Sequence, residues 1–151
     1  MKKLLGLLRN SRTSYGKKLF LQAYIVMSLV RLGLLLLPFN RLQNLVSKSQ
    51  RLTWLAFAPT QVTTNRIAVS VYRSSKYQPG KPMCLARALT AAVLMNIYGL
   101  SHQIQIGVAK GENGQLEAHA WVNSGGRVVV GNLPDLSRYV AMSSQIEGLI
   151  I

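Results

Sequence analysis

The hydrophobic repeat of this chain changes near Gly99, and this change limits the folds that the chain can adopt. Before Gly99, apolar residues recur at helical spacing or form long apolar runs, whereas polar and apolar residues alternate over 103–108 and 116–122. Turn residues lie at 110–114 and 124–126, and an apolar run returns at 128–130. The sequence therefore predicts an α+β fold, with a helical front half followed by a small antiparallel sheet of three strands.

Four helical segments are expected before the sheet, over residues 19–37, 41–48, about 65–75 and about 82–98. Pro38 ends the first, because proline cannot continue the hydrogen-bond ladder. Thr64 or Asn65 is expected to cap the third. The fourth begins at Pro82 or Met83 and ends at Gly99. Residues 51–60, with Trp54, Phe57 and Pro59, are interpreted as a packed connector, and 74–82 as a loop.

The charge of the chain is strongly positive and unevenly distributed. There are 18 lysines and arginines against 4 acidic residues, and the first acid is Glu112. Such a field favours an acidic partner. Nucleic acid is not favoured, because the basic residues are scattered singly, with neither a basic patch interleaved with aromatics nor a zinc-finger spacing. An acidic peptide or protein fits this distribution better.

The apolar stretch 19–37 has nearly the length of a membrane span, but polar residues interrupt it. Arg31 in such a span costs about 2.5–3.5 kcal/mol, and Gln22 and Ser28 break the run further. A signal peptide is not favoured, because the apolar run is too long and no small-residue cleavage site follows before Pro38. We expect a helix with its apolar face on the core and Arg31 at its edge. An interfacial helix and a true span are the alternatives.

Cys84 is the only cysteine, so an internal disulfide and a cysteine-based metal cluster are excluded. Nothing here demands an oxidising compartment, and a cytoplasmic location, with membrane association as the alternative, is expected. Cys84 falls in the first turn of the helix at 82–98, where unpaired amides and the helix dipole favour a thiolate and an oxyanion. The plain alternative is that a lone cysteine is a small buried hydrophobe.

His119 lies in the middle of the strand predicted at 116–122. Strand alternation places Leu116, Ala118, Ala120 and Val122 on one face, expected to be the core face, and Glu117, His119 and Trp121 on the other. A thiolate at a helix start and an imidazole on a strand that packs across that helix end form the pair used for attack on an amide carbonyl. A core or surface histidine is the alternative. His102 carries no such signal.

Two segments resemble the leader peptidase of lasso peptide biosynthesis, a family with a transglutaminase-like core. They are CLARALTAAVLMNIYGL at 84–100 and QIGVAKGENGQLEAHAWVNSGGRVVVGN at 105–132. The family's Cys-Leu-x-Arg and His-Ala-Trp-Val elements stand here at 84–87 and 119–122. The basic, leucine-rich front that ends in Leu-Pro-Phe at 37–39 matches as well. The resemblance implies one domain, with a helical basic front at 1–60 and a transglutaminase-like catalytic core at 61–151.

By this resemblance, Cys84 is the nucleophile and His119 the general base and acid. The family's third residue is an aspartate, and the position that aligns with it, near Gly131, carries no acid. Asp135 takes this role if the loop folds back. Asn132 is the alternative, and a water or a backbone carbonyl is the remaining one. Arg87, one turn from Cys84, and Trp121 are the candidate substrate-binding residues, with helix solvation the alternative for Arg87.

The resemblance also implies a substrate and partners. The substrate is a ribosomally made precursor whose leader is removed, after which a separate cyclase closes the ring. A leader-recognition domain does not fit within 151 residues, so a separate recognition protein is expected, docked by the acid-free front half. Neither a cofactor nor a metal is expected. The competing interpretations are a non-catalytic scaffold that presents the precursor to the cyclase, an acyl transferase, and a membrane-associated basic protein.

Overall fold

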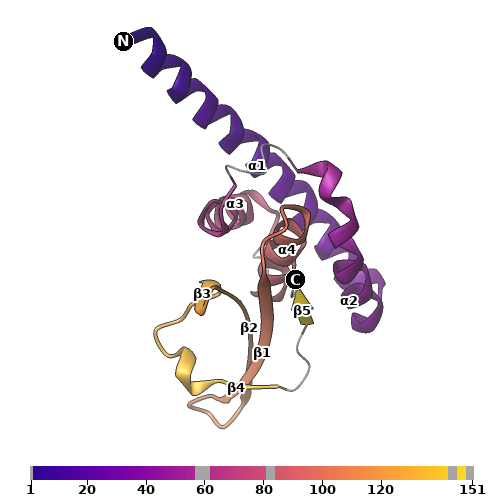
Figure 1. The fold of residues 1–151 in the computed structure, drawn as a ribbon. Helices are drawn as coiled ribbons and strands as arrows, with labels where there is room; N and C mark the ends of the chain where they lie inside the picture. Colours follow the sequence, from indigo (N-terminus) through magenta and orange to yellow (C-terminus); the bar gives the residue numbers. More distant parts are fainter. Residues whose placement is uncertain (1, 57–61, 81–83, 143–145, 149–151) are drawn as a thin grey trace.

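The computed structural model describes residues 2–56, 62–80, 84–142 and 146–148, with side chains for 16–56, 62–80 and 84–142. The helices are α1 (Lys2–Leu36), α2 (Phe39–Lys48), the 3-10 helix η1 (Ser49–Leu55), α3 (Thr64–Tyr77) and α4 (Cys84–Ile97). The strands are β1 (His102–Lys110), β2 (Leu116–Ser124), β3 (Arg127–Val130), β4 (Val140–Ala141) and β5 (Ile146–Gly148), with the 3-10 helix η2 (Leu136–Arg138) between β3 and β4. Helices followed by an antiparallel sheet confirm the predicted α+β fold (Figure 1).

The sheet has the order β3-β2-β1-β4, and β5 also pairs with β1. All pairings are antiparallel, and His119 of β2 lies opposite Gly107 of β1. The predicted meander β1-β2-β3 is confirmed. β4 and β5 were not predicted, and they pair with different stretches of β1, at 107–108 and 102–104.

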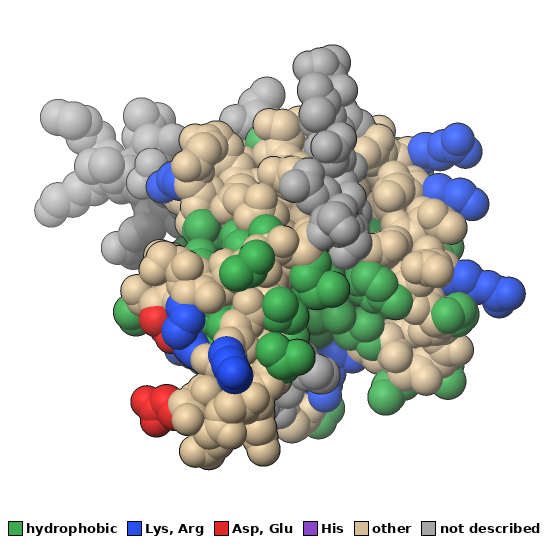
Figure 2. Space-filling view, turned by 90° about the horizontal axis from the view of Figure 1, so that it is seen from below, with side chains coloured by type: hydrophobic (Ala, Val, Ile, Leu, Met, Phe, Trp, Pro, Cys, Tyr) green, Lys and Arg blue, Asp and Glu red, His purple; other side chains and the backbone are tan. Residues whose placement is uncertain are grey.

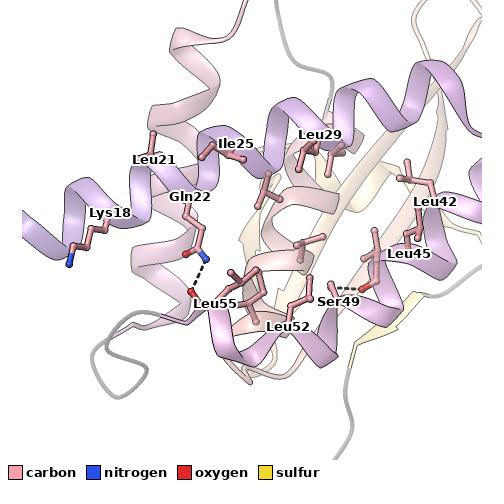
Figure 3. A pocket seen from close by; sticks show the side chains of 15 residues that line it. Lys18, Leu21, Gln22, Ile25, Leu29, Leu42, Leu45, Ser49, Leu52 and Leu55 are labelled. Carbon is pink, nitrogen blue, oxygen red and sulfur yellow. Dashed lines mark hydrogen bonds between the residues drawn. The ribbon is translucent and has the colours of Figure 1, made fainter.

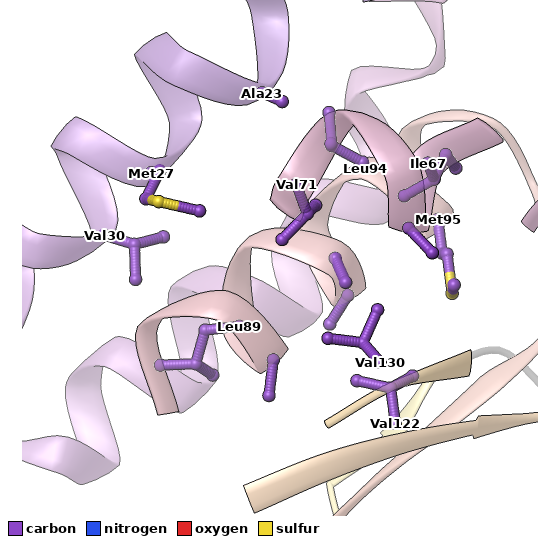
Figure 4. Packing of buried hydrophobic residues seen from close by; sticks show 14 of the residues in the cluster. Ala23, Met27, Val30, Ile67, Val71, Leu89, Leu94, Met95, Val122 and Val130 are labelled. Atoms are coloured by element: carbon purple, nitrogen blue, oxygen red, sulfur yellow. The ribbon is translucent and has the colours of Figure 1, made fainter. Parts of the chain in front are cut away.

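Helix α4 is the centre of the molecule, between the sheet and the helices α1 and α3 (Figure 1). Four small residues let the neighbouring elements approach its axis closely, because each presents only a methyl group: Ala86, Ala88, Ala91 and Ala92. Leu89, Leu94 and Met95 of the same helix are fully buried, in one apolar cluster with Val122 and Val130 of the sheet (Figure 4). This packing fixes the height of α4 above β2 and β3.

Helix α1 places one face on this core, as the sequence predicts. Leu19, Ala23, Met27 and Val30 are buried, and Arg31 at the edge donates a hydrogen bond from Nη1 to Gln78 Oε1 at 3.2 Å. The helix ends at Leu36, two residues before Pro38. Residues 16–36 are long and apolar enough to cross a membrane, by length and composition only.

Several local predictions are corrected by the structure. The cap of α3 is Thr63, whose Oγ1 accepts a hydrogen bond from the Arg66 N–H at 3.3 Å, and the helix extends to Tyr77 into the predicted loop. Trp54 is 75% exposed rather than packed. Phe57, Pro59 and the predicted helix start at 82–83 lie outside the described residues.

The predicted core face of β2 is confirmed only for its second half. Ala120 and Val122 are buried beneath α4, whereas Leu116 is 79% exposed and Ala118 is also exposed. The first half of β2 pairs with the C-terminal end of β1, at residues 108–110. Helix α4 therefore covers only half of this face. Trp121, expected on the opposite face, is also buried, and its indole lies over Gly107 of β1.

Candidate active site

Cys84 is the first residue of α4, and its thiol is free and half-buried. Its side chain packs at the margin of the apolar cluster, so α4 holds it in place from one side. The backbone amides of the first helical turn have no partner within the helix and carry the positive end of its dipole. The position can therefore stabilise a thiolate and the oxyanion of a tetrahedral intermediate.

His119 is held on β2 by a short hydrogen bond to the backbone. Its Nε2 lies 2.6 Å from the carbonyl oxygen of Gly131. A carbonyl oxygen only accepts, so Nε2 carries the proton and the neutral ring keeps its lone pair on Nδ1. The imidazole stacks on Trp121 at 6.1 Å between centroids and lies 5.5 Å from the ring of Tyr139. The ring is thus oriented, and its tautomer is the one in which Nδ1 can accept a proton.

Gly131 holds the carbonyl that orients this ring, and its conformation excludes a side chain. Its φ is +85°, and a Cβ would lie 2.7 Å from the carbonyl oxygen of Ala120 and 3.0 Å from two atoms of Trp121. Its N–H donates to the hydroxyl of Tyr72 on α3 at 2.9 Å. Gly131 is therefore held by Tyr72 of α3 through its N–H, and its carbonyl oxygen holds the ring of His119.

Asp135 and Asn132 lie after β3, and neither forms a hydrogen bond or ion pair with His119 in the described part of the chain. The carboxylate of Asp135 is 2.9 Å from Nη2 of Arg138 and 52% exposed. The pKa of Arg138 is raised, mainly by its side-chain hydrogen bond to Glu117 and to a smaller extent by the one to Asp135. The group at the ring nitrogen is thus a backbone carbonyl, that of Gly131. The sequence left a backbone carbonyl open as an alternative without naming its residue.

The two candidate substrate-binding residues have different surroundings. Arg87 is half-buried, and its Nε has no hydrogen-bond partner among the residues described, while its guanidinium lies 6.0 Å from the ring centroid of Tyr72. Trp121 is 5% exposed, and a Cβ on Gly107 would come within 2.8 Å of its indole. The unpaired Nε of Arg87 is thus itself buried, and Trp121 packs mainly against protein. The substrate-binding role of each stays a prediction.

The fold brings the elements of Cys84 and His119 together, since α4 packs on β2 and β3. No hydrogen bond joins their side chains in the described structure, which is common where a pair tightens only on substrate. No group of three metal-ligating side chains occurs in the described ranges. A nucleophile at a helix start and an oriented base on the adjoining strand can perform acyl transfer from an amide.

Sequence reasoning missed two supporting residues. Tyr72 lies in the helix predicted at about 65–75 and was given no role in the site, yet its hydroxyl accepts a hydrogen bond from the Gly131 N–H. Tyr139 was given no role; it packs beside His119, and its hydroxyl lies 3.4 Å from Glu117 Oε2. Loss of hydration, and then the charge of Glu117, raise the pKa of Tyr139. A glycine directly after a three-valine strand was the one available signal for a special backbone position.

A cysteine at the start of a central helix, packed on an antiparallel sheet that carries a histidine, defines the transglutaminase-like (papain-like) class of fold. Residues 26–144 match the sequence profile of the transglutaminase-like superfamily. This match spans both candidate catalytic residues, and the chain belongs to that superfamily. No curated protein and no solved structure shows significant similarity to the chain.

Proposed function

We propose that this chain is a cysteine peptidase that removes the leader from a ribosomally made lasso peptide precursor. The observation that carries the proposal is the hydrogen bond between His119 Nε2 and the Gly131 carbonyl. It selects the tautomer that a general base needs, on the strand against which the Cys84 helix packs. The choice of substrate rests on the Cys-Leu-x-Arg and His-Ala-Trp-Val elements at 84–87 and 119–122.

The reaction has two steps. Nδ1 of His119 takes the thiol proton, the Cys84 sulfur attacks the carbonyl carbon at the end of the leader, and the oxyanion is bound at the amides of the helix start. The imidazolium then gives that proton to the leaving amine, so the core peptide departs with a free amino terminus and a thioester remains. In the second step His119 deprotonates a water that attacks the thioester, which releases the leader as a carboxylic acid and restores the thiol.

The neutral carbonyl of Gly131 performs the orienting task of the third residue. It fixes the tautomer and the ring angle as a carboxylate does, but it stabilises the imidazolium less, because a hydrogen bond to an ionised acceptor is about twice as strong. We therefore expect a functional but slow peptidase.

The proposal includes partners and a location. A separate leader-recognition protein presents the precursor, a cyclase uses the freed amino terminus, and the reaction takes place in the cytoplasm. Support for an acidic partner comes from the first 111 residues, which hold no carboxylate. Raising the salt concentration should weaken the binding of this acidic partner. An affinity that stays unchanged over a wide range of salt concentration would contradict the electrostatic interpretation.

The test is cleavage of the precursor encoded beside this chain, with its recognition protein present, followed by mass spectrometry. The wild type should release an intact leader acid and a core peptide, while Cys84→Ala should release neither. Incorporation of an added amine into the leader instead of water would show an acyl transferase.

A non-catalytic scaffold of the same fold is the second candidate, favoured by the absence of a carboxylate at Gly131, where any side chain is excluded. The same assay separates the two candidates. A scaffold binds the precursor equally well as wild type and as Cys84→Ala, and neither form cleaves it.

A further inference from the structure

Helix α1 is apolar on the face opposite the core as well. Leu21, Ile25 and Leu29 are 57%, 50% and 62% exposed, and their spacing of four residues places them on one side of the helix. A helix that is apolar all round normally has both faces covered. The described structure covers only the face of α1 that packs on the core.

A groove with a volume of about 590 Å³ runs beside this exposed face, between α1 and the segment formed by α2 and η1 (Figure 3). Its walls are almost entirely aliphatic: α1 contributes the three residues above, α2 and η1 contribute Leu42, Leu45, Leu52 and Leu55, and α4 contributes Val93 and Ile97. Along α1 the groove extends from residue 18 to residue 30, which is about 18 Å at 1.5 Å per residue.

The few polar groups in the walls already have partners. Gln22 donates from Nε2 to the Leu55 carbonyl at 3.1 Å and accepts at Oε1 from the hydroxyl of Tyr98 at 2.7 Å. The hydroxyl of Ser49 donates to the carbonyl of Val46. An extended peptide would bury unpaired backbone groups against such walls, which is costly. A helix satisfies its own backbone, so the groove suits a helix of about three turns with leucine-like residues on one side.

The charge around the groove indicates which side chains flank the apolar face of the occupant. The elements that line it all lie within residues 2–97, which contain no carboxylate. Lys18 lines one end, and Lys48 and Arg51 are exposed beside the wall residues of α2 and η1. In Figure 2, several Lys and Arg side chains project from the edge opposite the acidic side chains, and others lie beside the acidic ones. An occupant with acidic flanks is thus attracted.

The same charge argument disfavours a second copy of this chain. The helices of a second copy carry the same excess of lysine and arginine, so their approach is repelled. A lipid surface meets a flat or convex apolar face, whereas these side chains line a hollow between two helical segments. The shape and the charge together favour a separate, acidic polypeptide.

We infer that the groove between α1 and α2–η1 is a docking site for an amphipathic helix with acidic flanks, carried by another polypeptide. The apolar face of that helix covers Ile25 and Leu29, and its carboxylates lie near Lys18, Lys48 and Arg51. The inference stands on the groove and its charge, so it holds whether or not Cys84 is catalytic.

The probe is a synthetic, fluorescently labelled helix of about 16 residues, cross-linked on its outer side because short helices are marginal in water. It carries leucines along one face and glutamates on both flanks. One control peptide has the same composition with the leucines distributed around the helix, and a second has lysine in place of each glutamate. Anisotropy titrations use the full chain as wild type, Leu29→Gln and Leu116→Gln. Leu116 is a leucine outside the groove and is even more exposed, at 79% against 62% for Leu29.

The acidic helix should bind, and Leu29→Gln should weaken it about tenfold, through lost burial of one leucine face. Leu116→Gln should bind as the wild type does, and binding should weaken as salt rises. Equal binding of either control peptide, or equal affinity of Leu29→Gln and wild type, would overturn the inference. So would failure to bind the probe while the chain sediments with vesicles of phosphatidylcholine and phosphatidylglycerol, which assigns the apolar face to a membrane.

Discussion

Replacing Gly131 by alanine tests whether the backbone carbonyl of this residue orients His119. The matched control is Gly126→Ala in the turn between β2 and β3. Both glycines have a positive φ, +85° for Gly131 and +78° for Gly126, but only Gly131 has neighbours where the new Cβ would lie. Both substitutions place alanine in a left-handed backbone conformation, which is unfavourable. Only in Gly131→Ala must the backbone also move away from the carbonyl oxygen of Ala120.

The expected free energies follow from these contacts. The left-handed conformation costs alanine about 1–2 kcal/mol, which is the whole effect expected for Gly126→Ala. Gly131→Ala adds about 1–3 kcal/mol for overpacking, so its free energy of unfolding should fall by about 2–5 kcal/mol in total. Moving the carbonyl by a fraction of an ångström lengthens the 2.6 Å bond to His119. A misplacement of about 1 Å can cost about a hundredfold in rate, so kcat should fall by about ten- to a hundredfold.

Urea titrations followed by circular dichroism give the two stabilities. Leader-release kinetics are then measured at a temperature where both variants are folded, so that kcat is compared for native protein. The reasoning is refuted if Gly131→Ala matches Gly126→Ala in both stability and kcat. It is also refuted if Gly131→Ala loses stability as predicted but keeps the kcat of the wild type.

Three further substitutions test other parts of the molecule. Tyr72→Phe removes the acceptor of the Gly131 N–H; kcat should fall about threefold while urea titration shows a loss below about 1 kcal/mol, because water replaces the hydroxyl. Asp135→Asn should keep its cleavage rate within about twofold of wild type, since its carboxylate pairs with Arg138 at the surface; a hundredfold loss would return Asp135 to the catalytic set. Burial lowers the pKa of His102, against the opposing effect of its hydrogen bond to the Leu100 carbonyl, so the unfolded chain binds the proton more readily. The free energy of unfolding of the wild type should therefore fall as pH drops below about 6.5. In His102→Gln this free energy should change less between about pH 7.5 and about pH 5.5. An equal pH dependence in the wild type and in His102→Gln would contradict this.

The fold could be predicted where the sequence repeats with a clear period. The alternation in β1 and β2 and the helical spacing before Gly99 give the α+β class without further knowledge. The strands β4 and β5 have two and three residues, which is too short for any period to show. Trp54 looked like a core residue by its chemistry alone, yet it is 75% exposed in the described part of the chain.

Within the candidate site, the sequence indicates the residues whose chemistry lies in the side chain, and their catalytic roles stay predictions. Cys84 and His119 stand out because a helix start and a strand centre are visible in the sequence. The carbonyl of Gly131 is invisible to such reasoning, since every residue has one and only the backbone path decides where it points. Asp135 was favoured for its carboxylate, but Arg138, three residues later, pairs with it.

The most direct test of the central claim is whether a covalent leader–enzyme adduct forms on Cys84. The precursor and its recognition protein are mixed with the chain, the reaction is quenched in acid during turnover, and the intact mass of the chain is measured. Because the chain has one cysteine, a thioester can form at only one site. We predict a population of wild type heavier by the leader mass less one water, with both that adduct and leader release absent in Cys84→Ala. Release of leader by Cys84→Ala at the wild-type rate would contradict the account.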